Sequence, residues 1–311
     1  MMIRVLVGAL VRAAVLLAAV SMLVFGATEL LPSDAAENRT GGRATDQQLA
    51  GLREDLGLDR PAWERYLGWA AGLLRGDAGR SLTTDRPVSS LLAERLPASL
   101  TLAGCGLAVA VPLALVLAGL VGTAPPRLRR SITVVTTTLA AIPQVVFAAG
   151  LVVIFAGVLT WLPPVSLLPP GEPPYTRPEL LVLPALALAV PAAAFGAGLL
   201  GGAVADTVSR PHVRDAVTRG VPRWRVAVRH VVPFVLAPAL RVLALITGGL
   251  LAATAVVEVL FGYTGLGELL VSSVGTRDAP VVQAVAMLTA STMLIGLTVA
   301  DGVAALTRDG R

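Results

Sequence analysis

The chain has 311 residues, of which 55% are hydrophobic and only 14% are charged, and its formal net charge is +5. Soluble domains are about a quarter charged, so this composition excludes a disordered chain and argues against a soluble enzyme. So much apolar surface indicates a protein that lies in a lipid bilayer. A basic chain can also bind nucleic acid, but the distribution of the charges described below indicates membrane sidedness instead.

The reactive side chains narrow the possible chemistry. All 25 basic residues are arginine, so no lysine can contact a nucleotide phosphate in a phosphate-binding loop or form a Schiff base. The single cysteine, Cys105, excludes an internal disulfide and a thiolate metal cluster. The two histidines, His212 and His230, lie in an arginine-rich stretch with only Asp206 and Asp215 nearby. We expect histidines on a helix surface, no metal site and no cofactor.

Six apolar runs are long enough to cross a membrane, which takes about 20 residues in a helix. They cover residues 5–30, 98–121, 132–159, 180–204, 234–261 and 281–306. The runs are continuous and rich in Leu, Ala and Val, whereas the strands of a membrane barrel alternate and are about half as long. The sequence therefore predicts an all-α polytopic membrane protein with six transmembrane helices. Neighbouring helices can tolerate the interior prolines, which often mark bends: Pro112, Pro143, Pro184 and Pro191.

The first run has a second interpretation. Arg4 and Arg12 before an apolar stretch, followed by the small residues of 33–36, are also typical of a cleaved signal peptide. The apolar stretch is long for a signal peptide, which favours a retained transmembrane helix at residues 1–30.

The charges between the runs alternate in sign. The N-terminus, the 123–131 connection, the 205–233 loop and the C-terminal tail are each net positive, whereas 31–97, 161–179 and 262–280 are each slightly negative. Positive loops remain in the cytoplasm. We therefore expect a multi-pass protein of the cell membrane, the inner or plasma membrane, with both termini cytoplasmic.

The spans themselves carry little charge. Arg241, Glu258 and Asp301 lie near the ends of runs, where we expect their side chains to reach the interface. Without an ionisable group at mid-bilayer, a proton-coupled or sodium-coupled transporter and an intramembrane protease are both less favoured. Ala194, Gly198 and Gly202 recur every four residues and predict close packing between helices, although a pore-lining face is compatible with them.

Residues 31–97 are predicted to form a small helical extracytoplasmic segment between helices 1 and 2. Thr45 and Gln48 make a capping-box pattern before a stripe formed by Leu49, Leu52 and Leu56, and Gly57 ends it. A second amphipathic stretch begins at Pro61, and a short interfacial helix is expected from 87 to 96. The segment is either a docking surface for a partner or a simple lid over the helix ends.

The arginine-rich loop after the fourth run is the most informative stretch. Residues 214–220 end at Gly220, and His230 and Pro233 follow after nine more residues. Two short helices separated by a turn at Gly220 would fit this pattern. The alternative is a loop that is positive only because it lies inside.

This spacing resembles the coupling loop of ABC-importer permeases. More narrowly, the chain resembles the dipeptide/oligopeptide/nickel permease subunits, the inner-membrane components of binding-protein-dependent transport systems. The resemblance runs along nearly the whole chain and rests on LGLDRP at 56–61, YL at 66–67, LRGD at 74–77, GRS at 79–81, RPV at 86–88, ERLPA at 94–98, IP at 142–143, WLPP at 161–164, LPAL at 183–186, RH at 229–230 and FGYTGLG at 261–267.

The chain also departs from the family pattern. Arg214 stands where the general importer motif has Glu, and Asp215 replaces its first Ala. A basic residue is frequent at the first of these positions in the peptide-importer branch. Pro233 and Phe234 stand where polar or basic residues are expected, and Thr264 replaces an expected Pro. Residues 31–56 are short for the family, so a reduced outer cap is expected.

The resemblance implies a non-catalytic transport subunit of an ATP-driven complex. Such a chain forms half of the translocation pathway for peptides or a related small solute, such as a nickel chelate. The implied organisation is a first transmembrane helix at 1–30, an extracytoplasmic segment at 31–97, and a five-helix permease core at 98–311 that contains the coupling loop at about 205–233. A secondary transporter of small solutes is the alternative, and a structural membrane scaffold is a third hypothesis.

The implied partners are a second, similar permease subunit, two cytoplasmic ATP-binding subunits, an extracytoplasmic solute-binding protein and membrane lipid, with no nucleic acid. The residues expected to couple to the ATPase are Arg214, Asp215, Ala216, Arg219, Gly220, Arg223, His230 and Pro233. The residues expected to contact the binding protein are Trp63, Tyr66 and Trp69.

Overall fold

The computed structural model describes residues 2–30, 45, 47–48, 50–51, 60–167, 172 and 174–309. These residues form helices and no β-strand, apart from an isolated bridge between Arg80 and Pro87, so the predicted all-α class is confirmed. The α-helices are α1 (Met2–Glu29), α4 (Ala62–Leu74), α5 (Val88–Thr123), α6 (Pro126–Ala141), α7 (Gln144–Val152), α8 (Glu179–Val208), α9 (Pro211–Thr218), α10 (Arg223–Val226), α11 (Val232–Phe261), α12 (Leu266–Gly275) and α13 (Ala279–Asp309). Two π-helical turns, η1 (Val153–Val158) and η3 (Ala227–Val231), and a 3₁₀ turn, η2 (Pro174–Thr176), complete them.

Five helices in the described part of the chain are long and apolar enough to cross a membrane. They are Val7–Glu29, Val88–Thr123, Glu179–Val208, Arg223–Phe261 and Ala279–Thr298. A bent pair, Pro126–Ala141 with Gln144–Val158, passes the same test as a unit. The predicted number of six holds when this pair is one span.

The third predicted span, 132–159, is sharply bent at one of the interior prolines that the sequence singled out. Its two halves meet at an angle of 100°, and the break lies at Ile142, which has an extended conformation (φ −68°, ψ 127°). Pro143 is the cause, since its ring disfavours the helical conformation in the residue before it and it has no N–H to donate. The other prolines singled out in the sequence lie inside continuous helices, α5 and α8.

The short helix expected at 87–96 is the first part of the second span and not an element of its own. Val88 begins α5, which runs without a break through Pro97 to Thr123. The proline removes one hydrogen bond from the helix, and neighbouring helices can compensate for that loss.

Helix α8 lies at the centre of the bundle and packs along α5, α11 and α6. Small residues allow this close approach: a Cβ atom added to Gly196 would lie 2.5 Å from Cδ1 of Ile246 on α11, and one added to Gly122 of α5 would lie 2.3 Å from Cγ1 of Val204. The predicted packing face was partly wrong. Ala194 is buried, but Gly198 and Gly202 are exposed, because α8 turns a neighbouring stripe of small residues toward its partners.

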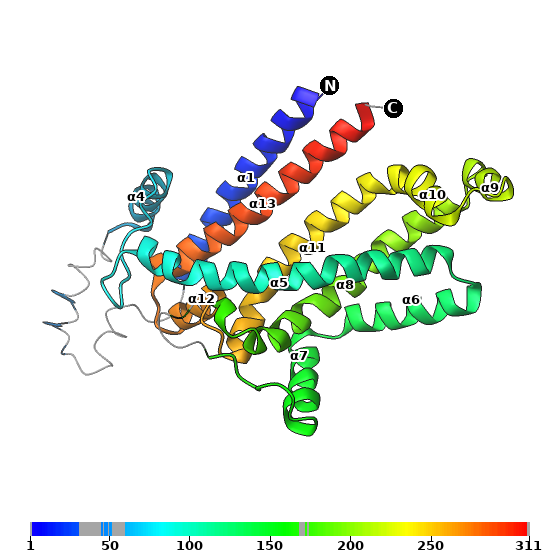
Figure 1. The fold of residues 1–311 in the computed structure, drawn as a ribbon. Helices are drawn as coiled ribbons and strands as arrows, with labels where there is room; N and C mark the ends of the chain where they lie inside the picture. Colours follow the sequence, from blue (N-terminus) through cyan, green and yellow to red (C-terminus); the bar gives the residue numbers. More distant parts are fainter. Residues whose placement is uncertain are drawn as a thin grey trace.

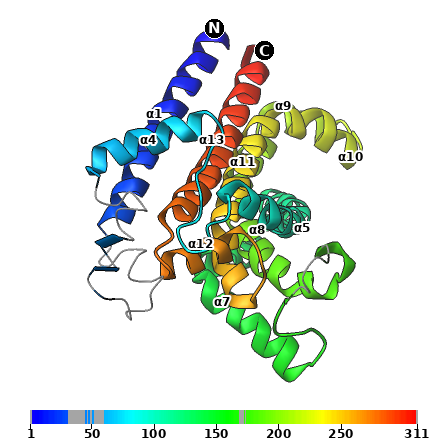
Figure 2. The same cartoon turned by 90° about the vertical axis from the view of Figure 1, so that its left-hand side faces the viewer.

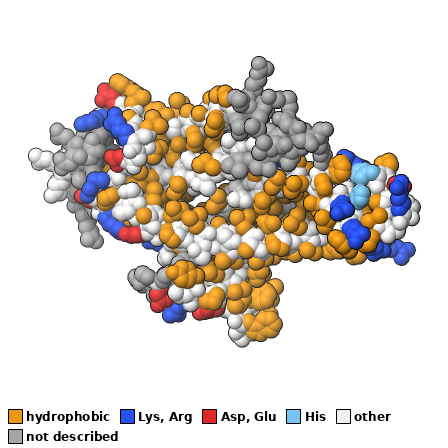
Figure 3. Space-filling view, turned by 45° about the horizontal axis from the view of Figure 1, so that its top comes forward, with side chains coloured by type: hydrophobic (Ala, Val, Ile, Leu, Met, Phe, Trp, Pro, Cys, Tyr) orange, Lys and Arg blue, Asp and Glu red, His pale blue; other side chains and the backbone are white. Residues whose placement is uncertain are grey.

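The molecule has two distinct ends, which we call the α9 end and the α12 end. Figure 1 shows α9, α10 and the α5–α6 connection at one end and α4 and α12 at the other. Figure 2, which looks from the α12 end, shows α5 and α8 nearly end-on. On the face in Figure 3, arginine and histidine side chains gather at the α9 end, charges of both signs at the α12 end, and hydrophobic side chains between them.

The first and last helices lie side by side. Helix α1 packs against α13, and the Gln283 side chain donates to the Thr28 hydroxyl across this contact (2.8 Å). Both helices point their free ends away from the α12 end (Figure 1). Only 11% of the apolar window of α1 is buried, against 61% for α8, so most of α1 faces away from the rest of the chain.

Within residues 31–97, the predicted capping box is confirmed. The Thr45 N–H donates to Oε1 of Gln48 (3.0 Å), and the Gln48 N–H donates to the Thr45 hydroxyl oxygen (3.4 Å). The leucine stripe predicted after it, at 49, 52 and 56, and the stop at 57 lie outside the described residues.

Candidate functional site

The arginine-rich loop folds as the expected pair of short helices around Gly220. Helix α9 ends at Thr218, and Gly220 has a φ of +75°. The Gly220 N–H donates to the Val217 carbonyl (3.0 Å), and the Val221 N–H donates to the Ala216 carbonyl (3.1 Å). These two bonds define a Schellman motif, which ends a helix with a residue in the left-handed conformation and satisfies its last carbonyls.

The loop has a small apolar core of its own. Val213, Ala216 and Val226 are buried, and Val221 and Val231 pack against them. The core joins α9, α10 and the end of η3, so the loop is a compact unit. Ala216, one of the expected coupling residues, lies inside this core.

The opposite face of the loop is basic and exposed. Arg214, Arg219 and Arg223 are exposed there, and Arg219 pairs with Asp215 across one helical turn (2.8 Å). An exposed pair of this kind contributes little stability. These four expected coupling residues therefore form an accessible surface at the α9 end.

Two apolar side chains that sequence reasoning missed are exposed on the same loop. Val217 is 57% exposed and Trp224 is 64% exposed, with the Arg225 guanidinium 5.2 Å from the Trp224 ring centroid. An exposed Trp among arginines is typical of the anchors of protein–protein interfaces. Val217 and Trp224 lie on either side of the Gly220 turn. Two large apolar residues within an arginine-rich loop were visible in the sequence and could have indicated a contact surface.

Phe234 connects the loop to the long helix that follows it. The His212 ring lies 4.8 Å from the Phe234 ring, and the Arg210 guanidinium lies 5.3 Å from it. Nε2 of His212 also lies 3.4 Å from the His230 carbonyl oxygen. The expected polar residue at 234 is therefore replaced by an aromatic platform for the start of α9.

The expected residue Pro233 lies directly after the π-helical turn η3, as the second residue of α11. In an α-helix a proline ring clashes with the carbonyl four residues before it. The wider π turn accommodates the ring, so the chain runs from α10 into α11 without a break.

The three aromatic residues of α4 are divided between an internal contact and an exposed surface. Tyr66 and Trp69 of α4 pack against Phe25 of α1, with ring centroids 5.4 and 6.1 Å from that of Phe25. The Tyr66 hydroxyl also bonds Ser21 (2.9 Å). Trp63 is 63% exposed. Tyr66 and Trp69 thus hold α4 on α1, and Trp63 is the one of the three that is available to a partner.

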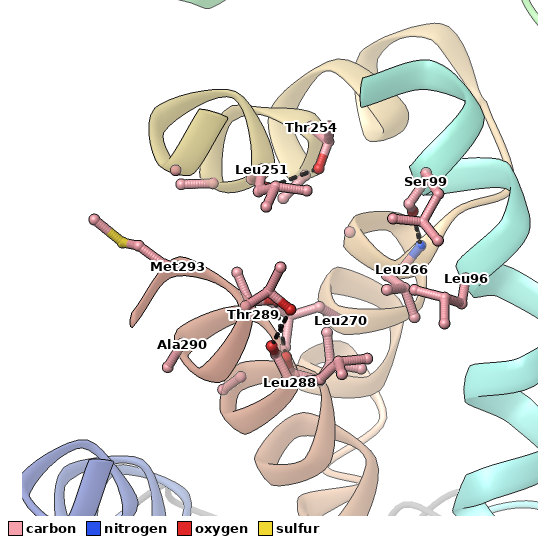
Figure 4. Close-up of a pocket in the computed structure, with 18 residues that line it drawn as sticks. Leu96, Ser99, Leu251, Thr254, Leu266, Leu270, Leu288, Thr289, Ala290 and Met293 are labelled. Atoms are coloured by element: carbon pink, nitrogen blue, oxygen red, sulfur yellow. Dashed lines mark hydrogen bonds between the residues drawn. The ribbon is translucent and has the colours of Figure 1, made fainter. Parts of the chain in front are cut away.

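A cavity of about 360 Å³ lies near the α12 end, between α5, α11, α12 and α13. Figure 4 shows its lining, which is mainly Leu, Ala and Gly with a few hydroxyl groups. Those of Thr254 and Thr289 donate to carbonyls of their own helices. The lining thus offers apolar contacts, and among the described residues no three His, Cys, Asp or Glu side chains are grouped to hold a metal ion.

Comparison with known proteins identifies the family. Residues 94–308 match the family model described as "Binding-protein-dependent transport system inner membrane component". Residues 2–103 match the one described as "Binding-prot-dependent transport system membrane comp, N-term". The chain belongs to this family.

Relatives along most of the chain have similar names. The permease is 30% identical over 269 residues to a peptide transport system permease of Brucella suis biovar 1 (strain 1330), covering 85% of this chain and 84% of the relative. It is 32% identical over 276 residues to the glutathione transport system permease GsiC of Pectobacterium atrosepticum (86% of both chains). It is 30% identical over 292 residues to the D,D-dipeptide transport system permease DdpB of Escherichia coli K12 (87% and 86%).

These comparisons confirm the resemblance seen in the sequence. The chain is a permease subunit of an ABC importer, of the peptide and oligopeptide family, and a multi-pass protein of the inner membrane.

Proposed function

We propose that this permease forms half of the pathway by which peptides enter the cell. The support comes from the relatives, whose names specify peptides, glutathione and D,D-dipeptides. A nickel chelate, the other cargo considered from the sequence, appears in none of these three names. The subunit itself contributes shape and leverage rather than chemistry, and ATP hydrolysis belongs to separate subunits.

The proposed orientation places the α9 end in the cytoplasm and the α12 end outside. The α9 loop and the α5–α6 connection contribute a cluster of arginines at one end of the molecule (Figures 1 and 3). Both termini point away from the other end. Arginine-rich short loops stay on the cytoplasmic side, so both termini would be cytoplasmic.

The exposed basic face of the α9 loop is the proposed contact with a cytoplasmic ATP-binding subunit. The exposed Val217 and Trp224 would supply apolar anchors, and the exposed Arg214, Arg219 and Arg223 would supply positive charge on the same loop. The complementary partner surface is an apolar groove with an acidic rim. The buried core around Ala216 keeps α9 and α10 together, so a push on this face would reach α11 through η3 and Phe234.

The other proposed partners follow from the family, whose members are components of binding-protein-dependent transport systems. We place the solute-binding protein at the α12 end, where Trp63 is exposed. A second, similar permease subunit would cover part of the apolar surface of α1 that is exposed in this chain.

Uptake by the reconstituted complex tests the proposed function. The permease, its partner subunits and the binding protein in proteoliposomes are expected to accumulate labelled di- or oligopeptide only when ATP is present on the α9 side. Trypsin on that side, which cleaves after the exposed arginines of the loop, is expected to stop uptake. Peptide uptake by the purified chain alone without ATP would favour a secondary transporter, and a complex that lacks ATPase subunits altogether would favour a scaffold.

Replacing Trp224 by alanine is expected to weaken binding of the ATP-binding subunit about 30-fold, because a buried interface tryptophan typically contributes about 2 kcal/mol or more. The measurement is the affinity of purified ATPase subunits for the permease in detergent. Val228→Ala is the matched control, since Val228 is as exposed as Val217 but lies on η3. Equal affinities for the Trp224 variant and the unaltered permease would place the contact elsewhere.

A further inference from the structure

The position of Glu258 near the end of an apolar run led us to expect that its side chain reaches the membrane interface, but it does not. Its side chain is fully buried at the end of α11, among the most enclosed side chains of the described chain. A charged group is expensive to bury unless it is paired or hydrogen-bonded, so the partners of Glu258 decide what it does.

Every described hydrogen bond to the Glu258 carboxylate comes from a donor on another segment. The Ser99 hydroxyl of α5 donates to Oε1 (2.6 Å), and the N–H groups of Gly267 and Glu268 donate to Oε2 (2.6 and 3.2 Å). The Leu266 N–H in turn donates to the Ser99 hydroxyl oxygen (2.7 Å), a bond drawn in Figure 4. Two side chains therefore satisfy the first three N–H groups of α12.

This arrangement is an N-terminal cap supplied by other helices. The first N–H groups of a helix have no partner within it, and a side chain of the preceding residue usually provides one. In α12 that residue is Gly265, which has no side chain. A carboxylate at a helix N-terminus also interacts favourably with the helix dipole. Glu258 and Ser99 thus provide the cap from α11 and α5.

Glycines make the cap possible. A Cβ atom on Gly265 would lie 2.3 Å from Cδ of Glu258, and one on Gly267 would lie 2.1 Å from Cα of Ala255. Neither distance is compatible with a side chain. The glycines of the FGYTGLG stretch therefore have a physical explanation: the backbone must pass directly over the Glu258 carboxylate and α11.

Further contacts hold the same helix. The Tyr263 hydroxyl donates to the Ala98 carbonyl (2.9 Å), and burial raises the pKa of this hydroxyl well above its usual range, so it remains a donor. Arg95 of α5 pairs with Glu268 (3.2 Å). After the C-terminal end of α12, the buried Asp278 accepts hydrogen bonds from Ser81 and from the Leu82 N–H.

We propose that Glu258 is a positioning residue for transport, which together with Ser99 fixes α12 in the wall of the permease. Leu266, Gly267 and Leu270 of α12 line the apolar cavity, so the position of α12 determines the shape of that cavity. The carboxylate acts as a hydrogen-bond acceptor and not as a carrier of protons. This inference depends on the permease identity and not on the proposed cargo.

Two substitutions separate these roles. Glu258→Gln keeps the length and an oxygen that can accept from Gly267 and Glu268, whereas Glu258→Ala removes both acceptors and leaves buried N–H groups unpaired. We expect ATP-driven uptake at least about tenfold higher in the glutamine variant than in the alanine variant, from the usual penalty for unpaired buried groups. Equal loss in both variants would mean that the charge or a proton matters, and normal uptake in both would remove any role; either result overturns the proposal.

A spin label on α12 gives a readout that does not depend on transport. The chain has one cysteine, so a label at Val271→Cys in a Cys105→Ser background is unique, and Val271 is half exposed. Label mobility is expected to rise with Ser99→Ala and with Glu258→Ala, and to fall back toward the original with Glu258→Gln. The control is Ser272→Ala, which removes a hydroxyl on the same helix whose described hydrogen bond, to the Leu269 carbonyl, stays within α12. If the Glu258→Ala protein does not accumulate in the membrane, the Ser99→Ala variant alone tests the proposal. Label mobility in that variant equal to that of the labelled permease without the substitution contradicts the proposal.

Discussion

Replacing Gly220 by valine is expected to reduce ATP-driven uptake by at least about tenfold while leaving membrane insertion intact. A left-handed conformation costs an ordinary L-residue about 1–2 kcal/mol, and a β-branched one more. Space is not the obstacle, because among the described residues no atom beyond Gly220 and its two chain neighbours lies within 4 Å of a Cβ added there. The valine therefore acts through the backbone alone: it opens the Schellman motif and turns α9 away from α10. Uptake in proteoliposomes and binding of the ATP-binding subunit are the measurements.

The matched control for this prediction is Gly220→Asn, since asparagine adopts the left-handed conformation more readily than other residues with a side chain. Uptake by the asparagine variant is expected to lie close to that of the unaltered permease. Normal uptake by the valine variant would show that the turn at Gly220 is dispensable. Equal loss with valine and asparagine would show that any side chain there obstructs the partner.

Adding a single methyl group at Gly267 is expected to destabilise the permease by about 3 kcal/mol or more, at the upper end of the usual effect of overpacking. The new Cβ would lie 2.1 Å from Cα of Ala255 and 2.9 Å from its backbone nitrogen, and a backbone cannot move aside as a side chain can. Helix α12 would have to move away from α11, which breaks its bonds to Glu258. The measurement is the fraction of monodisperse protein that remains after heating in detergent.

Gly275→Ala is the control for this effect, because it makes the same change in the same helix. In the part of the chain that the structure describes, no atom beyond the adjoining backbone of α12 lies within 4 Å of a Cβ added at Gly275, and alanine favours a helix over glycine by up to about 1 kcal/mol. This variant is expected to be as stable as the unaltered permease or slightly more so. Similar losses in the two variants would mean that α12 tolerates no added bulk and that the contact with Ala255 is not special.

The features that sequence reasoning found are those that depend on neighbouring residues. Long apolar runs predict spanning helices because the backbone must satisfy its own hydrogen bonds in lipid. The turn at Gly220 and the capping box of Thr45 and Gln48 were predictable for the same reason, since each is complete within a few residues. The sequence marked Pro143 as a candidate bend, but it could not show that this proline alone of the four would break its span at 100°, because the effect of a proline depends on how neighbouring helices pack around it.

The site features that were missed depend on residues far apart in the chain. Glu258 turns inward because Ser99, 159 residues earlier, and the start of α12 supply donors. Phe234 supports α9 by packing against the His212 ring, and hydropathy alone cannot distinguish it from a lipid-facing residue. Tyr66 and Trp69 turn toward α1 because Phe25 lies there. Positions of this kind become visible only when the helices are assembled.

The pairing of α1 with α13 has a consequence for biosynthesis. Thr28 and Gln283, which join these helices, are 255 residues apart. At about 5–20 residues per second, the ribosome needs roughly 10–50 s between synthesising the first of these residues and the second. During that interval α1 lies in the membrane without α13. Lipids, insertion factors or a neighbouring subunit can therefore contact the face of α1 that later packs against α13. The last helix to emerge must then displace any such occupant.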